Sequence, residues 1–227
     1  MGVKISRNMN RMPTKLIPPP LLELGSKQSV EKGRESGFQL FGQPIFSNKH
    51  NLVATILVNS GVDITPLIST FEQTSKKLKV DLKVNKMVCD MNKDKNIYNN
   101  FDRAMQDYSN TNIFLVVIPK HIQSLYPKLK QQLLKAQGGI EMVSQFVTEF
   151  TLRKKGLQSI ATKILLQMIA KRGNILWVPS YGEEMMNTLD RACLVGLDSS
   201  SKDGRALVSA VGTTNTTFSL LSSASVL

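Results

Sequence analysis

The chain has 227 residues, with 29 Lys and Arg against 17 Asp and Glu, which gives a formal net charge of +12. This excess attracts polyanions at long range and favours phosphate backbones as partners. A membrane partner is disfavoured, because no apolar run approaches the roughly 20 residues of a spanning helix and the N-terminus lacks a secretory apolar segment. We expect an intracellular protein, cytoplasmic or nuclear.

The first part of the chain, residues 1–48, differs from the rest. It combines Pro18–Pro20, several glycines and scattered charges with little periodicity. This composition predicts a linker over residues 1–50, with one short strand near Phe38–Phe41.

From Leu52 onward, short apolar runs alternate with helical patterns. Such alternation predicts an α/β fold over residues 51–180, with a parallel sheet covered by helices on both faces. The expected elements are a strand at Leu52–Val58, a helix at Pro66–Lys77, a strand at Lys79–Val84, a helix at Ile97–Tyr108, a strand at Ile113–Ile118, a helix that begins at a Ser124 cap, a strand at Gln145–Phe150, a helix at Leu157–Lys171 and a strand at Ile175–Val178.

Parallel sheets of this kind bind ligands beyond the carboxyl ends of their strands. The expected strand Ile113–Ile118 leads directly into the loop Pro119–Leu125 at such an end. We therefore expect a binding pocket beside this loop.

A second unit begins after residue 180. Cys193–Asp198 and Ala206–Gly212 have strand character and are joined by the polar turn Ser199–Gly204, which suits a hairpin. Too few residues follow to bury a sheet, so residues 181–227 are interpreted as the truncated start of a second domain. The Ser- and Thr-rich end, Thr213–Leu227, is either its next strand or a divergent tail.

The two cysteines, Cys89 and Cys193, are far apart and have no CxxC or histidine partner at metal-ligand spacing. They indicate neither a disulfide framework nor a zinc site. Cys193 lies in an apolar run, which predicts a buried thiol. There is no P-loop sequence and no GxGxxG motif, so nucleotide hydrolysis and dinucleotide redox chemistry lack their usual support.

The helix expected at Leu157–Lys171 carries a buried stripe beside a polar face. Lys163, Gln167 and Lys171 follow one another at four-residue intervals, and Lys171 lies nearest the apolar edge. A lysine there can fold its stem under the domain and present its ammonium at a pocket floor. The alternative is a solvated lysine near a helix C-terminus, with Gly173 as the stop signal. The stripe consists of Leu157, Ala161, Ile164, Leu165, Met168 and Ile169.

The helix expected after Ser124 places Tyr126 and Lys130 one turn apart, beside its core-facing leucines. This pair offers a ring for stacking, a hydroxyl, and an ammonium near the positive helix N-terminus, where anions bind well. A surface tyrosine beside a surface lysine is the alternative. Together with Gln145 and Lys171, the pair has a spacing that could close on one terminal phosphate, which indicates a site for the end of a nucleic-acid strand.

Four segments, IPKHIQSLYPKLK, SQFVTEFTL, SIATKILLQMIAKRGNILWVP and RACLVGLDSSS, resemble in that order the MID domain and the start of the PIWI domain of Argonaute proteins, closer to the Piwi branch. The resemblance extends roughly over Leu52–Thr217 and is most specific over Leu157–Pro179. Upstream, MPTKLIPPPLLE resembles the linker that precedes the MID domain. The resemblance implies a Rossmann-like MID domain followed by an incomplete RNase H-like PIWI start.

In that family the MID domain holds the 5′ phosphate of a small guide RNA through a Tyr-x-x-x-Lys pair, a downstream glutamine and a lysine at a helix end. The matching residues here are Tyr126, Lys130, Gln145 and Lys171. The Piwi branch also uses a glutamine one turn before the last lysine to hold a divalent ion, such as Mg²⁺, against the phosphate. Gln167 matches that position.

The loop that senses the first guide base corresponds to Pro119, Lys120, His121 and Ile122. Asp198 matches the first metal-binding carboxylate of the PIWI nuclease, at the end of its first strand. Because two-metal cleavage needs several carboxylates, this chain alone is not expected to be an enzyme. Target RNA would be contacted only through the guide.

Two departures from the family pattern bear on the interpretation. Phe146 stands where cysteine usually follows the pocket glutamine, and Asn174 replaces a glycine after the last lysine. Because Phe146 lies beside a pocket residue, an Argonaute-like interaction module that has lost guide binding stays open as an alternative. An unrelated Rossmann-like ligand-binding domain is disfavoured, because Asn59–Asp63, after the first strand, contains a single glycine.

Overall fold

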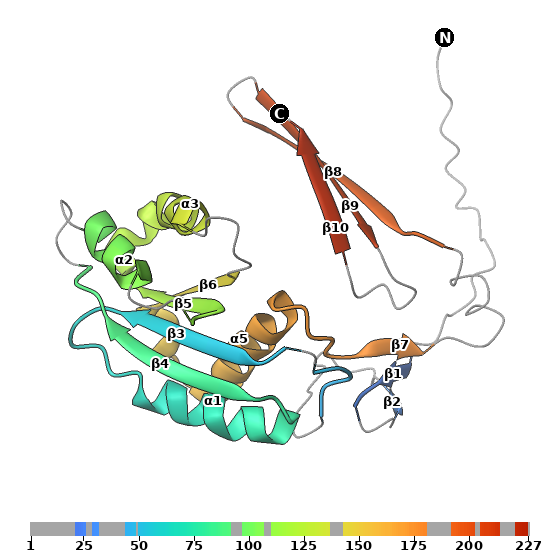
Figure 1. The fold of residues 1–227 in the computed structure, drawn as a ribbon, viewed down its shortest axis with the longest axis horizontal. Coiled ribbons are helices and arrows are strands. Elements are labelled where there is room, and N and C mark those ends of the chain that lie inside the picture. The colour runs from blue at the N-terminus through green and yellow to red at the C-terminus, as the bar shows by residue number, and fades with distance from the viewer. Residues whose placement is uncertain are drawn as a thin grey trace, which may run out of the picture.

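The fold is given by a computed structural model (Figure 1). The structure describes residues 21–25, 29–31, 44–48, 50–91, 97–106, 110–136, 143–180, 192–202, 205–213 and 221–226. The strand predicted near Phe38–Phe41 lies outside these residues. Within them, no helix is long and apolar enough to cross a membrane.

The central element is a sheet of four parallel strands with the order β4-β3-β5-β6. The apolar runs that predicted β3 and β5 match these strands at both ends, because both are buried on both faces. The last residues of β5 and β6, Ile118 and Thr148, are paired, so these two strands end at the same edge. The strands are β3 (Leu52–Val58), β4 (Leu82–Val88), β5 (Ile113–Ile118) and β6 (Val143–Thr148).

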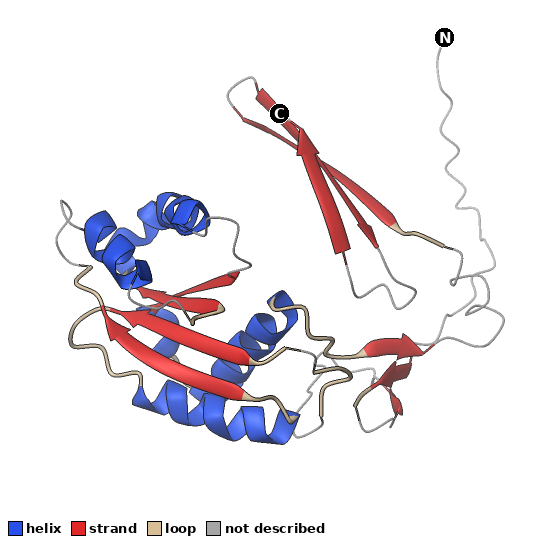
Figure 2. Cartoon of the chain, viewed as in Figure 1, coloured by secondary structure: helices blue, strands red, loops and turns tan. Residues whose placement is uncertain are grey.

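Helices cover both faces of this sheet, as the alternating pattern predicted (Figure 2). On one face α1 (Thr65–Leu78) packs beside α5 (Leu157–Lys171). On the other face α2 (Ile97–Gln106) packs beside α3 (Tyr126–Ala136). Two buried cores result, one under each helix pair. Their largest side chains include Phe71 of α1, Phe101 of α2 and Phe114 of β5.

Two strands begin or end away from their predicted positions because of local capping. β4 begins at Leu82 rather than Lys79, since Lys79 adopts a left-handed conformation, with φ of 55°, and caps α1. β6 ends at Thr148 rather than Phe150, since the hydroxyl of Thr148 accepts a hydrogen bond at 3.3 Å from the backbone N–H of Thr151. This bond caps the short helix α4 (Glu149–Leu152).

A second, antiparallel sheet joins the start of the described chain to the residues after α5. It consists of β1 (Leu21–Glu23), β2 (Ser29–Glu31) and β7 (Val178–Ser180), in the order β2-β1-β7. The strand predicted at Ile175–Val178 is therefore displaced. Ile175 instead pairs with Ser47 in an isolated bridge. The segment predicted as a linker thus contributes strands to the fold.

The turn after α5 is fixed by Gly173 and Asn174. Gly173 has φ of 89°, so the left-handed residue is the glycine and not the asparagine that follows it. The Asn174 side chain is 5% exposed. Its Oδ1 accepts from the backbone N–H of His50 at 3.0 Å, and its Nδ2 donates to the His50 carbonyl at 3.0 Å. Asn174 therefore ties the end of α5 to the residues before β3.

The C-terminal strands form a third sheet with the antiparallel order β10-β9-β8. The predicted turn Ser199–Gly204 is too long, because β8 continues to Lys202. Cys193 is exposed, so the prediction of a buried thiol is wrong. The strands are β8 (Val195–Lys202), β9 (Arg205–Thr213) and β10 (Leu221–Val226).

Candidate functional site

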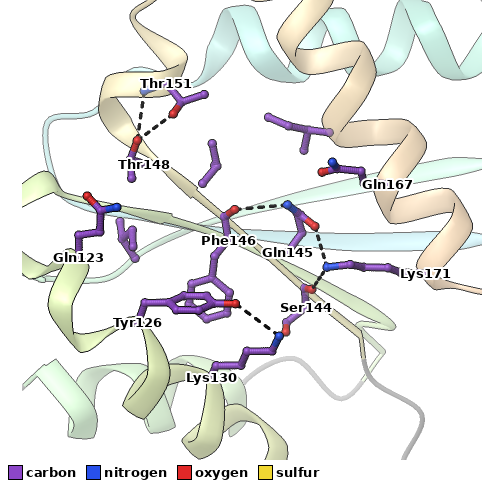
Figure 3. Close-up of a pocket in the computed structure, with 13 residues that line it drawn as sticks. Gln123, Tyr126, Lys130, Ser144, Gln145, Phe146, Thr148, Thr151, Gln167 and Lys171 are labelled. Atoms are coloured by element: carbon purple, nitrogen blue, oxygen red, sulfur yellow. Dashed lines mark hydrogen bonds between the residues drawn. The ribbon is translucent and has the colours of Figure 1, made fainter. Parts of the chain in front are cut away.

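A cavity of about 520 Å³ lies along the edge strand β6, between α3 and α5 (Figure 3). It reaches Ile118 and Thr148, the last residues of β5 and β6, and therefore touches the expected carboxyl edge of the sheet. Five of the residues predicted to form the site line it together: Tyr126, Lys130, Gln145, Gln167 and Lys171. The described residues that line the cavity include two lysines and no carboxylate.

Lys171, the last residue of α5, extends to the edge strand (Figure 3). Its ammonium donates to the backbone carbonyl of Ser144 at 2.9 Å and to Oε1 of Gln145 at 2.8 Å. Although the residue is exposed, its ammonium is partly desolvated in this position. Burial, followed by the positive charge of Lys130, lowers the pKa of Lys171. Lys163, two turns earlier, is exposed and does not line the cavity.

The edge position of β6 explains why its carbonyls are available to side chains. An outer strand pairs on one side only, and alternate carbonyls point away from the sheet. Ser144 and Phe146 are two residues apart on β6, and both carbonyls accept from side chains. Lys171 donates to the first, and Nε2 of Gln145 donates to the second at 3.3 Å.

Tyr126 and Lys130 lie on α3, opposite Lys171 across the cavity (Figure 3). The Lys130 ammonium donates a long hydrogen bond, 3.4 Å, to the Tyr126 hydroxyl and lies 5.8 Å from the centre of its ring. The rings of Tyr126 and Phe146 meet edge to face, with centroids 4.9 Å apart and an angle of 88°. Phe146, the departure from the family pattern, therefore supports the Tyr126 ring and leaves the cavity open.

The start of α3 differs from the prediction. A 3-10 helix over Lys120–Leu125 precedes it, and Ser124 lies inside this turn instead of at a cap. The backbone N–H of Tyr126 donates to the carbonyl of Gln123. This N–H is thus not available to an anion.

The residues predicted to sense the first base do not line the cavity. Pro119 and Ile122 are buried, whereas Lys120 and His121 are exposed. Gln123 is the residue of this turn that does line it. Residues three apart in a 3-10 helix share a face, so Gln123 lies on the Tyr126 side of the turn. The sequence prediction missed Gln123, because it treated the segment as an irregular loop.

Two threonines at the far end of the cavity were also missed. Thr148 and Thr151 line it, and their hydroxyl oxygens are 2.8 Å apart. Both belong to the N-terminal cap of α4. In the sequence, this cap is marked only by two threonines three residues apart in the segment SQFVTEFTL.

Asp198 lies within β8, which continues to Lys202, and not at the end of the strand as its match to the nuclease carboxylate implied. Its Oδ1 accepts from the Ser199 N–H at 2.9 Å. The described part of the chain contains no group of three His, Cys, Asp or Glu side chains that could hold a metal ion.

Comparison with known proteins gives matches among solved structures. No protein-family model matches the sequence, and no curated protein matches it. Drosophila Piwi matches 93% of this chain with a TM-score of 0.75 and 17% identity. An A. aeolicus Argonaute matches 92% with a TM-score of 0.61 and 17% identity. An Argonaute from Methanocaldcoccus janaschii in complex with guide DNA matches 79% with a TM-score of 0.51 and 15% identity.

The similarity extends over a limited part of these larger proteins. This chain covers 30% of the Piwi chain, 30% of the A. aeolicus chain and 27% of the third. The parallel sheet flanked by helices is therefore shared with Argonaute proteins, as the resemblance implied. This chain has an Argonaute/Piwi-like fold, and it corresponds to about 30% of the length of such a protein.

Proposed function

We propose that the chain binds the 5′-phosphorylated end of a small guide RNA, as the MID part of a Piwi or Argonaute protein. One observation carries this proposal: two lysine ammoniums and a tyrosine hydroxyl, from α3 and α5, line one cavity without a carboxylate among its described residues. A terminal phosphate has about −1.5 to −2 charges at pH 7 and accepts strong hydrogen bonds from cationic donors. The guide DNA bound to a protein of similar fold supports a guide strand as the ligand class.

The size of the cavity supports a whole terminal nucleotide as the occupant. Its volume of about 520 Å³ exceeds the needs of a phosphate alone. Tyr126 is 36% exposed, and its ring is held by Phe146, so it offers a fixed surface for the first base. We place the edge of that base near Gln123, because this side chain lines the cavity.

The open cavity also favours a domain that binds a guide strand over an Argonaute-like interaction module that has lost guide binding. Phe146 is bulkier than the usual cysteine, but it packs against Tyr126. Target sequence would be left to base pairing with the guide, and we propose no cleavage activity for this chain alone.

Two otherwise identical short RNAs, one with a 5′ phosphate and one with a 5′ hydroxyl, test the proposal. The full chain should bind the phosphorylated RNA more tightly, by about tenfold or more, since one factor of ten corresponds to about 1.4 kcal/mol. Fluorescence anisotropy with a 3′ label measures both affinities at one fixed salt concentration, because the backbone contribution varies with salt. Equal affinities would refute phosphate recognition. The same pair made of DNA tests whether the sugar matters.

We further propose that Mg²⁺ strengthens this binding through Gln167. Gln167 lines the cavity one turn before Lys171 and offers a neutral amide oxygen. Mg²⁺ keeps several waters and takes few protein ligands, usually carboxylates, beside phosphate oxygens. No carboxylate is among the described residues that line the cavity, so the phosphate and the Gln167 amide oxygen would supply the ligands. Adding Mg²⁺ should raise the affinity for the 5′-phosphorylated RNA in the wild type, and less so in Gln167→Leu. An identical change in affinity on adding Mg²⁺ in both proteins would show that Gln167 takes no part in metal binding and is an ordinary surface residue of the helix.

A further inference from the structure

The outer strand β4 has a basic edge, and we propose that this edge binds an extended acidic segment of a partner protein, which adds to the sheet as a further strand. The surface is separate from the cavity between α3 and α5, because β4 and β6 form opposite edges of the parallel sheet (Figure 1). Binding at β4 therefore does not require the guide site.

The backbone of β4 directs the hydrogen-bonding groups of every second residue away from the sheet. The N–H of Leu52 donates to the carbonyl of Asp81 at 3.0 Å, just before β4 begins. Just after β4 ends, the N–H of Cys89 donates to the carbonyl of Val58 at 2.9 Å. Odd-numbered residues of β4 therefore face β3, and even-numbered ones face outward. The outward residues are Leu82, Val84, Lys86 and Val88.

This outer edge is long and has no partner strand within the described residues. β4 spans seven residues, and its one strand neighbour in the described part of the chain is β3. Edge strands are often kept short or covered, because their free N–H and C=O groups pair readily with another chain. A peptide that adds to such an edge binds through main-chain hydrogen bonds, and its side chains determine the specificity.

Charge determines which kind of peptide fits. Residues 76–86 include five lysines, all exposed, against a single carboxylate, Asp81. Hydrogen bonds from Thr65, and then the charge of Lys86, lower the pKa of Asp63, so Asp63 lies close enough to offset part of the Lys86 charge. The edge as a whole stays positive and attracts a peptide with carboxylates.

The same lysines argue against two other occupants. A second copy of the chain would bring two lysine-bearing edges together, and like charges on neighbouring strands repel each other. An RNA strand would be attracted by the lysines. However, its backbone has no alternating N–H and C=O groups that could pair with the outward groups of β4. An acidic peptide uses both the charge and the backbone of the edge.

The two faces of β4 define a side-chain pattern for the partner. Lys86 shares a face with Val84, which packs against the core under α1. Lys83 shares the other face with Met87, which packs against the core under α2. Carboxylates three residues apart in the partner would therefore meet both lysines. Val88 is 56% exposed and offers an apolar contact two residues beyond Lys86.

A peptide with this pattern, Thr-Glu-Val-Thr-Glu-Thr-Val with blocked ends, tests the proposal on the full chain by NMR. Binding should shift the amide signals of the four outward residues and slow the hydrogen exchange of their N–H groups. The N–H groups of Lys83, Asn85 and Met87 should change less, because they already face β3. A peptide with lysines in place of both glutamates should not bind.

A charge exchange tests the role of the two lysines. Combining Lys83→Glu with Lys86→Glu should weaken binding of the glutamate peptide by about tenfold and allow the lysine peptide to bind. The matched control combines Lys155→Glu with Lys163→Glu, an equal change of charge at exposed positions outside β4. It should leave the affinity within about twofold of the wild type.

Lys86→Pro and Lys86→Thr separate backbone pairing from charge. Both variants lose the ammonium, but only proline also loses the outward N–H, and proline is tolerated where an edge strand faces solvent. Lys86→Pro should bind the glutamate peptide roughly three- to tenfold more weakly than Lys86→Thr. Thermal unfolding checks that the fold is kept, and hydrogen exchange in the wild type reports the same pairing without a substitution.

Unchanged exchange of the outward amides at millimolar peptide would overturn the proposal, and so would equal affinities of the Pro and Thr variants. A short 5′-hydroxyl RNA that shifts these amides more strongly than the peptide would instead assign the edge to nucleic acid. Dimers of the wild type that Lys86→Pro abolishes would assign it to a second copy. The preference for a 5′ phosphate should be the same in all these variants, because neither Lys83 nor Lys86 lines the cavity.

Discussion

Lys171→Ala is expected to weaken binding of the 5′-phosphorylated RNA by roughly 10- to 100-fold, since a hydrogen bond to a charged group contributes about 1.5–3 kcal/mol. The side chain supplies one of the two cavity ammoniums, and its removal leaves the Gln145 oxygen and the Ser144 carbonyl without their donor. Binding of the 5′-hydroxyl twin should change much less. Anisotropy titrations of both RNAs measure the effect.

Lys163→Ala is the matched control for this change. Lys163 has the same charge and lies on the same helix, but it is exposed and outside the cavity. Its loss should weaken the binding of both RNAs slightly and equally, as expected for a contact to the backbone of the RNA strand. A larger loss of phosphate preference from Lys163→Ala than from Lys171→Ala would place the phosphate elsewhere.

The pH dependence of the wild type provides a second measure of Lys171. Burial and then the charge of Lys130 hold the pKa of Lys171 below its ordinary value. Only the charged form attracts the phosphate, so the contribution of Lys171 is complete below this lowered pKa and disappears as the pH rises through it. The phosphate preference should therefore fall on the alkaline side, and this fall should begin at a lower pH in the wild type than in Lys171→Ala.

Tyr126 should show two separable contributions, a hydrogen bond and stacking. Tyr126→Phe keeps a ring against Phe146 but loses the hydroxyl that Lys130 contacts at 3.4 Å. It should cost about 0.5–1.5 kcal/mol of binding free energy. Tyr126→Ala also removes the stacking surface and should cost about 1–3 kcal/mol more.

Affinities of both variants for the phosphorylated RNA measure this difference, and thermal unfolding of each variant checks that the fold is kept. Equal affinities for the Phe and Ala variants would argue against stacking on Tyr126. A loss confined to RNAs with one particular first base would instead point to recognition of the base edge.

Elements with long, regular apolar patterns could be predicted well from the sequence. The helix Leu157–Lys171 was predicted with the bounds that α5 has, because its stripe is continuous and Gly173 supplies a left-handed stop. Strands that end in a cap were displaced by a few residues. The left-handed backbone of Lys79 and the hydrogen bond that the Thr148 hydroxyl accepts determine where these strands begin and end. Neither feature can be recognised from the spacing of apolar residues in the sequence.

Prediction of the site depended on helical spacing and on a family resemblance. These brought Tyr126, Lys130, Gln145, Gln167 and Lys171 to one cavity. The contacts among them were not predictable in this way. They depend on β6 being the outer strand, with free carbonyls, and strand order is a property of the folded sheet.

The pairing of the N-terminal strands β1 and β2 could not be predicted from the sequence, for a physical reason. β1 and β2 have three residues each, too few for an alternating pattern to emerge. The second partner of β1 is β7, which lies beyond the whole parallel sheet in sequence. Composition alone therefore favoured a linker over residues 1–50, although Ile45 is 4% exposed and packs in the core beside α1.

The connection between the two ends of this domain bears on the order in which it folds. The turn after α5 is held by His50, and the residues beyond it pair with Ser47 and β1. These contacts join segments more than 100 residues apart, and such contacts have a high loop-closure entropy and form slowly. Lys171 precedes this turn directly. Lys171 itself is held by Ser144 and Gln145 of β6. The tie beyond it is therefore expected to form late in folding, after the parallel sheet has acquired its core.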